Sequence, residues 1–96
     1  MNKYEVQKRE NLMYLLDELE DKARVFNSFK YTNNVQCLSY YSGMIQGIIR
    51  SIEIVYRFYV EVNYCEKDGC NLISEINIIN KNKIKRSIKI MLGDIK

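Results

Sequence analysis

The 96-residue chain contains no histidine, no proline and no tryptophan. Enzymes use histidine more than any other residue for acid–base work near neutral pH, because its unperturbed pKa lies in that range. No glycine-rich phosphate-binding loop stands in its place. We therefore expect a protein that is not an enzyme, with no catalytic residues and no cofactor.

Cysteine is scarce and unevenly placed. Cys65 and Cys70 have the spacing C-x4-C, and Cys37 lies far from both. An odd number of cysteines argues against a disulfide framework. A structural zinc site takes four ligands, usually in close cysteine pairs or with histidines. We expect three free, reduced thiols and no metal site.

Long hydrophobic runs are missing too. The most apolar stretch is interrupted by Arg50, Glu53 and Arg57 before about 18 uncharged residues accumulate, the length that a membrane span needs. The first ten residues mix lysine, arginine and glutamate, and no apolar segment of a secretory signal follows them. The expected location is cytoplasmic, without a membrane partner. The length predicts a single domain over residues 1–96.

The first part of the chain predicts an amphipathic helix. Asn2 followed by Glu5 is typical of a capping box. Apolar side chains then recur at spacings of three and four, on one helix face: Leu12, Leu15, Leu16, Leu19, Ala23 and Phe26. Residues 27–34 are rich in turn-forming and capping types, and we expect the helix to be broken there.

A second helix is predicted from Asn33, with Gln36 placed for another capping box. Its apolar positions follow nearly a strict heptad and leave only a narrow polar strip, so the helix must be buried on more than one side. A dimer or higher oligomer would supply part of that cover. The predicted oligomer interface is formed by Ile45, Ile49, Ile52 and Tyr56. Gly43 and Gly47 would permit close approach of another helix.

From Phe58 onward the apolar period changes from that of a helix to two, which predicts strands. Residues 66–69 and 80–82 are typical of turns between them. The predicted fold is α+β, an N-terminal antiparallel helical hairpin followed by a small antiparallel β-sheet. Residues 72–92 also fit one side of a helical wheel, with Gly93 as its C-cap. The alternative fold is therefore all-α, with three long helices.

Tyrosines and arginines supply the first candidate site. The residues proposed to bind a partner or ligand are Tyr40, Tyr41, Arg50, Tyr56, Arg57 and Tyr59. Tyrosine and arginine are enriched in protein interfaces. They also suit a nucleotide pocket, where aromatic rings hold the base and arginine holds phosphate. Core packing with hydroxyls that reach solvent is the third interpretation.

Lysines supply the second candidate. Residues Lys81, Lys83, Lys85 and Lys89 would lie on one face of the last strand, with Arg86 opposite. An exposed basic ridge of this kind can contact phosphates. The alternative is a charged face that protects an edge strand from aggregation.

These observations favour a small, non-catalytic, cytosolic binding or regulatory protein that self-associates and acts by occupying a partner's surface. Its size and composition would suit a phage or mobile element that inhibits a host defence factor. Two other hypotheses stay open: a nucleic-acid-binding regulator that uses the lysine ridge, and a protein that sequesters a nucleotide or similar small ligand.

Overall fold

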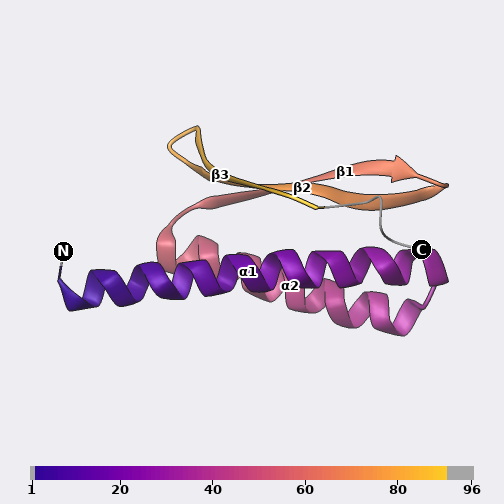
Figure 1. The fold of residues 1–96 in the computed structure, drawn as a ribbon, viewed down its shortest axis with the longest axis horizontal. Helices are drawn as coiled ribbons and strands as arrows, with labels where there is room; N and C mark the ends of the chain where they lie inside the picture. Colours follow the sequence, from indigo (N-terminus) through magenta and orange to yellow (C-terminus); the bar gives the residue numbers. More distant parts are fainter. Residues whose placement is uncertain (1, 91–96) are drawn as a thin grey trace.

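The computed structural model describes residues 2–90, which form two helices and three strands. Their order is α1 (Lys3–Thr32), α2 (Val35–Tyr56), β1 (Tyr59–Lys67), β2 (Cys70–Asn80) and β3 (Lys83–Lys89). The helices run antiparallel, and the sheet covers one side of the pair (Figure 1). All strand pairs are antiparallel, and β2 lies in the middle. The predicted helical hairpin with a small antiparallel sheet is confirmed.

The all-α alternative is wrong, because β2 and β3 occupy most of the segment on which it depended. Its proposed C-cap, Gly93, lies outside the described residues. Both hairpin turns explain why the chain reverses here instead of continuing as a helix. Asp68 and Gly69 form one turn and Lys81 and Asn82 the other, all four with positive φ. Two-residue turns of this left-handed type match the twist of antiparallel strands.

Helix α1 begins where the sequence predicts and ends later. The side chain of Asn2 accepts a hydrogen bond from the Glu5 N–H at 2.8 Å, which confirms the predicted cap. The break expected over residues 27–34 is confined to its last two residues, because the helix continues through Thr32. Turn-forming residue types in the last turns were overridden by tertiary packing of this segment against the sheet.

Two asparagines separate the helices. Asn33 takes the left-handed conformation, with φ of 52°, and ends α1. Asn34 begins α2, since its side chain accepts from the Cys37 N–H at 3.1 Å. The α2 cap is thus one residue later than the sequence analysis placed it. Asparagine suits both positions because it tolerates the left-handed region and caps helices well.

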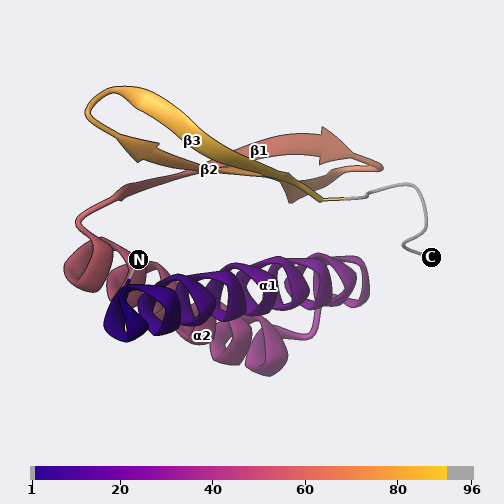
Figure 2. The same cartoon turned by 60° about the vertical axis from the view of Figure 1, so that its left-hand side comes forward.

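The core lies between the sheet and the helix pair (Figure 2). Its buried side chains come from all five elements, and the completely buried ones include Leu19 of α1, Ile52 of α2 and Ile76 of β2. Helix α1 packs on β2, and α2 packs on β1. The side of the helix pair that faces away from the sheet has no cover from any described part of the chain (Figure 1).

One buried polar side chain ties α1 to the sheet. Asn27 is completely buried, and its amide donates to the Ile73 carbonyl at 2.9 Å. Its side-chain oxygen accepts from the Ile73 N–H, also at 2.9 Å. Strand β3 does not pair this far along β2, so the asparagine amide takes the place of a strand there. Both of its hydrogen-bonding groups are satisfied, as buried amides require.

Candidate functional site

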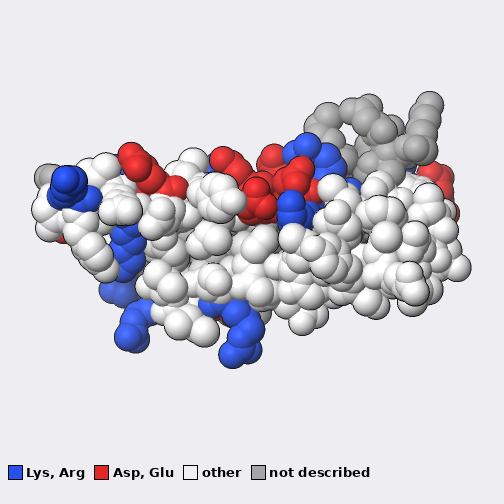
Figure 3. Space-filling model, turned by 90° about the horizontal axis from the view of Figure 1, so that it is seen from below, with Lys and Arg blue, Asp and Glu red and all other residues white. Residues whose placement is uncertain are grey.

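The most prominent surface feature is the side of α1 and α2 turned away from the sheet, here called the outer face. Figure 3 looks directly onto it and shows a broad uncharged area, with charged side chains gathered mainly along its margins. Large apolar side chains of both helices are more than half exposed: Tyr4 and Tyr14 from α1, and Tyr40, Ile54 and Val55 from α2. Clusters of exposed apolar side chains on a soluble domain mark interaction sites.

Two shallow hollows lie between the helices on this face. The first, of about 330 Å³, is lined by Tyr14, Glu18, Met44, Gly47, Ile48 and Ser51. The second is lined by Tyr4, Gln7, Lys8, Asn11, Val55 and Tyr56. Both are open and mainly apolar, so they suit side chains of a macromolecule better than an enclosed small ligand.

Charge is nearly missing from α2. Arg50 and Glu53 are its two charged residues. The Glu53 carboxylate is used locally, since it accepts a hydrogen bond from the Val60 N–H at 3.3 Å. Arg50 is exposed, and so is Arg57 just after the helix. The acidic side chains Glu18 and Glu20 of α1 are paired within their own helix. The outer face is therefore apolar with charged margins.

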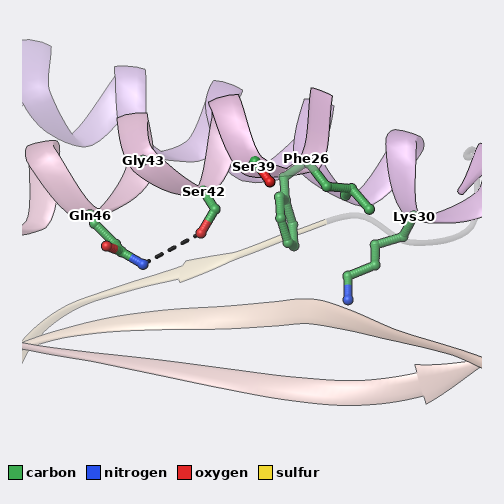
Figure 4. Close-up of a pocket in the computed structure, with 7 residues that line it drawn as sticks. Phe26, Lys30, Ser39, Ser42, Gly43 and Gln46 are labelled. Carbon is green, nitrogen blue, oxygen red and sulfur yellow. Dashed lines mark hydrogen bonds between the residues drawn. The ribbon is translucent and has the colours of Figure 1, made fainter. Parts of the chain in front are cut away.

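A third depression, here called the side cleft, is formed by residues of α1 and α2, several of whose side chains point toward the sheet (Figure 4). Its volume is about 440 Å³, and its lining comes from Phe26 and Lys30 of α1 and from Leu38, Ser39, Ser42, Gly43 and Gln46 of α2. A smaller hollow continues inward to Val62 and Tyr64 of β1. The Lys30 ammonium lies 5.5 Å from the centre of the Phe26 ring. Lys30 is the one charged residue among those that line the cleft.

The two glycines of α2 have no packing reason within the described chain. A Cβ atom added at Gly43 or Gly47 would meet nothing within 4 Å. Glycine inside a helix costs about 1 kcal/mol relative to alanine. Gly43 lines the side cleft, and Gly47 lines a hollow of the outer face. Both glycines thus leave the surface of α2 without a projecting side chain, although glycine destabilises the helix.

The predicted tyrosine–arginine site is divided in the structure. Tyr41 stacks on Phe29, and the Tyr40 ring meets it edge-on with centroids 5.2 Å apart. At the other end of α2, Tyr56 stacks on Phe58. Tyr59 lies on the face of the sheet away from the helices, opposite Ile79. Of the six residues, Tyr40 and Arg50 lie exposed on α2, whereas the set as a whole forms no common pocket.

The residues predicted as an oligomer interface are used within the chain. Ile45 and Ile52 belong to the buried core, and Ile49 packs against it. The Tyr56 hydroxyl donates to the Lys8 carbonyl at 2.8 Å. These four residues are therefore covered, wholly or in part, by α1 and the sheet of their own chain.

The predicted lysine ridge is discontinuous. A bulge at Lys85 shifts the β2–β3 register between Ile78 and Ile79. Because each residue shift turns side chains to the other face, Lys83 and Lys89 lie on opposite faces of the sheet. Lys81 belongs to the turn, not the strand. Arg86 faces the helices, with its guanidinium 3.1 Å from the Met13 sulfur. The bulge places Lys83 on this same face, whereas Arg86 was predicted to lie opposite all four lysines.

Two tyrosine hydroxyls differ sharply in their surroundings. Burial raises the pKa of Tyr31, helped by the nearby Asp68, and its hydroxyl is buried without a hydrogen-bond partner. Burial also raises the pKa of Tyr56, helped by Tyr4. The Tyr56 hydroxyl has its partner in the Lys8 carbonyl. The sequence alone gives no signal that separates these two residues.

We expect opposite results when each hydroxyl is removed. Tyr31→Phe should raise the free energy of unfolding, because a polar group without a hydrogen-bond partner is lost. Tyr56→Phe should lower it by about 1 kcal/mol, because the Lys8 carbonyl loses its donor. Urea unfolding at neutral pH measures both. Equal effects of the two variants would contradict the difference in hydrogen bonding.

The described residues offer little for other chemistries. Cys37, Cys65 and Cys70 are free thiols, and the Cys70 sulfur lies 3.8 Å from the Lys30 carbonyl. Within residues 2–90, no three histidine, cysteine or acidic side chains gather as a metal site would require. Neither α1 nor α2 combines the length and hydropathy that crossing a membrane demands.

No protein-family model, no curated protein and no solved structure matches this chain.

Proposed function

We propose that this is a small, non-catalytic binding protein that self-associates and acts by occupying a partner protein's surface with its outer face. The observation that carries the proposal is the broad uncharged area of the outer face (Figure 3). Both helices have large exposed apolar side chains, among them Tyr4, Tyr14, Tyr40 and Ile54. Tyrosine supplies large, rigid contact area at low entropic cost, which makes it a common anchor of protein interfaces. Occupation of a host defence factor's surface by a phage or mobile-element protein is the context that we propose.

Nucleic-acid binding receives less support than the outer face. The four predicted lysines do not share one face, and Lys89 stands opposite the acidic Glu75 in the strand register. A nucleotide site receives less support too, because Arg50 and Arg57 are exposed and not gathered with the tyrosines around one cavity.

The test is a comparison of two variants of the outer face. Tyr40→Ser combined with Ile54→Ser removes two exposed anchors and should leave the melting temperature within about 2 °C, because surface changes cost little. The partner recovered with tagged wild-type protein is identified, purified and titrated by calorimetry. We expect the double variant to weaken its affinity at least about 100-fold, the effect of losing two anchor residues.

The matched control alters the opposite surface. Tyr59→Ser combined with Ile84→Ser removes two equally exposed apolar side chains from the sheet face away from the helices. This control should bind the partner as the wild type does. Unchanged affinity of the Tyr40 and Ile54 double variant would contradict the proposal, and so would equal loss in the control.

A further inference from the structure

We infer that the open edge of β1 pairs with β1 of a second copy of this chain, so that two three-stranded sheets join into one and the two α2 helices meet above the seam. This inference rests on the self-association in the proposed function and gives it a surface. That surface is separate from the outer face, which stays available to a different partner.

The β1 edge is built for pairing. β1 is a terminal strand of the sheet. The Asn63 carbonyl points inward and accepts from the Ser74 hydroxyl of β2 at 3.1 Å, whereas the Val60 N–H points outward to Glu53. Because peptide directions alternate along a strand, the even-numbered residues 62–66 turn their N–H and C=O groups to the open edge. Such a row of peptide groups is a template for another strand.

The opposite edge carries more protection against strand pairing than β1 does. β3 is seven residues long, contains a bulge at Lys85 and presents lysines at both ends. Bulges and lysines are the usual means of keeping an edge strand from pairing. β1 is nine residues long, the register shift beside it falls in β2, and its one lysine is its last residue. The fold thus protects one edge and leaves the other for a partner.

The helix above this edge indicates that the partner brings a helix of its own. α2 packs over β1, so a two-fold axis along the β1 edge would bring two α2 helices close together. The α2 residues that line the side cleft have uncharged side chains, among them Ser39, Gly43 and Gln46 (Figure 4). Gly43 has open space around it within the described chain. A bare peptide strand would pair with β1 and leave this surface uncovered, whereas a second copy covers both.

The register of the pairing follows from the sheet faces and the charges. Directly opposite residues of two antiparallel strands have their side chains on the same face of the sheet. The helices of both copies therefore lie on one side of the joined sheet only when the two-fold axis lies midway between a residue and the same residue of the second copy. An axis at Asn63, the midpoint of β1, gives the longest overlap of the two strands, with the Val60 N–H at each end still bonded to Glu53. It places Val62 beside Tyr64 of the second copy on the helix side, and Glu61 beside Cys65 on the other. An axis at Glu61 would instead place two carboxylates opposite each other, which is destabilising.

Disulfide trapping tests this register directly. Asn63 would face its own copy as a pair without hydrogen bonds, with Cα atoms about 4.5 Å apart. That separation permits a disulfide. We therefore expect Asn63→Cys, in a chain with Cys37, Cys65 and Cys70 replaced by serine, to form a covalent dimer with oxidised glutathione. Tyr59→Cys is the control: it is exposed on the same strand, but its copies would be about 26 Å apart, so it should stay monomeric in denaturing gels.

A second measurement covers the case in which the cysteine-free chain folds poorly. Light scattering on the wild-type protein over a range of concentrations should give the mass of a dimer. Gly43→Leu projects a side chain into open space of the monomer, and we expect it to raise the dimer dissociation constant at least tenfold without lowering the helix content. Tyr64→Pro removes an outward-facing N–H of the edge strand and should have the same effect on the dimer.

The outcomes separate the two proposals. A wild-type protein that is monomeric at every concentration overturns both the inference and the self-association. A dimer that Asn63→Cys fails to trap and Gly43→Leu fails to weaken overturns the β1 pairing alone. Loss of partner binding in the Tyr40 and Ile54 double variant, with the dimer intact, leaves the inference standing.

Discussion

Replacing Asn27 by leucine is expected to lower the free energy of unfolding by about 3 kcal/mol, because it leaves two buried backbone groups of Ile73 without partners. Leucine has nearly the same shape as asparagine, so the loss reports the hydrogen bonds more than a cavity. The Ile73 N–H and C=O each bond to the Asn27 amide at 2.9 Å. Domain stabilities are typically about 5–15 kcal/mol, so this is a large fraction.

The control is Asn11→Leu, an exposed asparagine on the same helix, which should change the stability by no more than about 0.5 kcal/mol. Urea unfolding followed by circular dichroism measures both variants. If Asn27→Leu unfolds at the same urea concentration as the wild type, the amide does not hold α1 to β2.

Asn27→Asp provides a second test that depends on pH. The new carboxyl group could still accept from the Ile73 N–H, but its other oxygen would face the Ile73 carbonyl. Burial and that carbonyl would raise the carboxyl pKa above its ordinary value of about 3.9. Because the folded-state pKa is raised, the stability difference from this carboxyl group is smallest below about pH 4, its unfolded pKa, and the variant loses stability as the pH rises through the folded value. The wild type has asparagine here and should not show this additional loss.

The fold was predictable from the sequence because its signals agree with one another. The change from helical spacing to a period of two at Phe58 coincides with the start of β1 one residue later. Asn2 and the Asp68–Gly69 turn satisfy simple rules of capping and hairpin geometry. Such rules depend on neighbours in the chain, so one sequence is enough to apply them.

The errors concern features that depend on distant parts of the chain. The tail of α1 looked like a loop because asparagine and serine favour turns and caps. Asn27 instead lies inside the helix, where its side-chain amide bonds to the backbone C=O and N–H of Ile73, 46 residues away. The bulge at Lys85 has no reliable local signature, yet it alone reverses the face on which Lys83 lies. A single shift of register was enough to divide the predicted basic ridge.

The candidate sites were harder to predict than the fold for a similar reason. The periodicity of α2 predicted a helix buried on more than one side, but a pattern cannot say which partner covers which side, and within the described chain the outer side of α2 is exposed. α1 and the sheet cover the heptad stripe, and this leaves Tyr40, Gly43 and Ile54 at the surface. The sequence signal that could have found this surface is the pair of glycines, which favour close approach where no local turn requires them.

Ile52 provides the strongest test of whether α2 is buried by its own chain. The side chain is completely buried in the core between the helices and the sheet. Ile52→Ala should therefore lower the free energy of unfolding by about 3–4 kcal/mol, from lost apolar burial and the cavity that remains. Ile54→Ala, two residues further along the helix, removes as many atoms from a side chain that is 67% exposed. Its effect should stay within about 0.5 kcal/mol.

The dependence on protein concentration separates the two roles that Ile52 could have. A residue in the core of one chain contributes to stability whether or not a second copy is bound, so the difference between Ile52→Ala and the wild type should be the same at low and high concentration. A residue in an oligomer interface would instead show a difference that grows with concentration, because association stabilises the folded state by mass action. A difference that grows in this way would place Ile52 between copies and would contradict the intramolecular core.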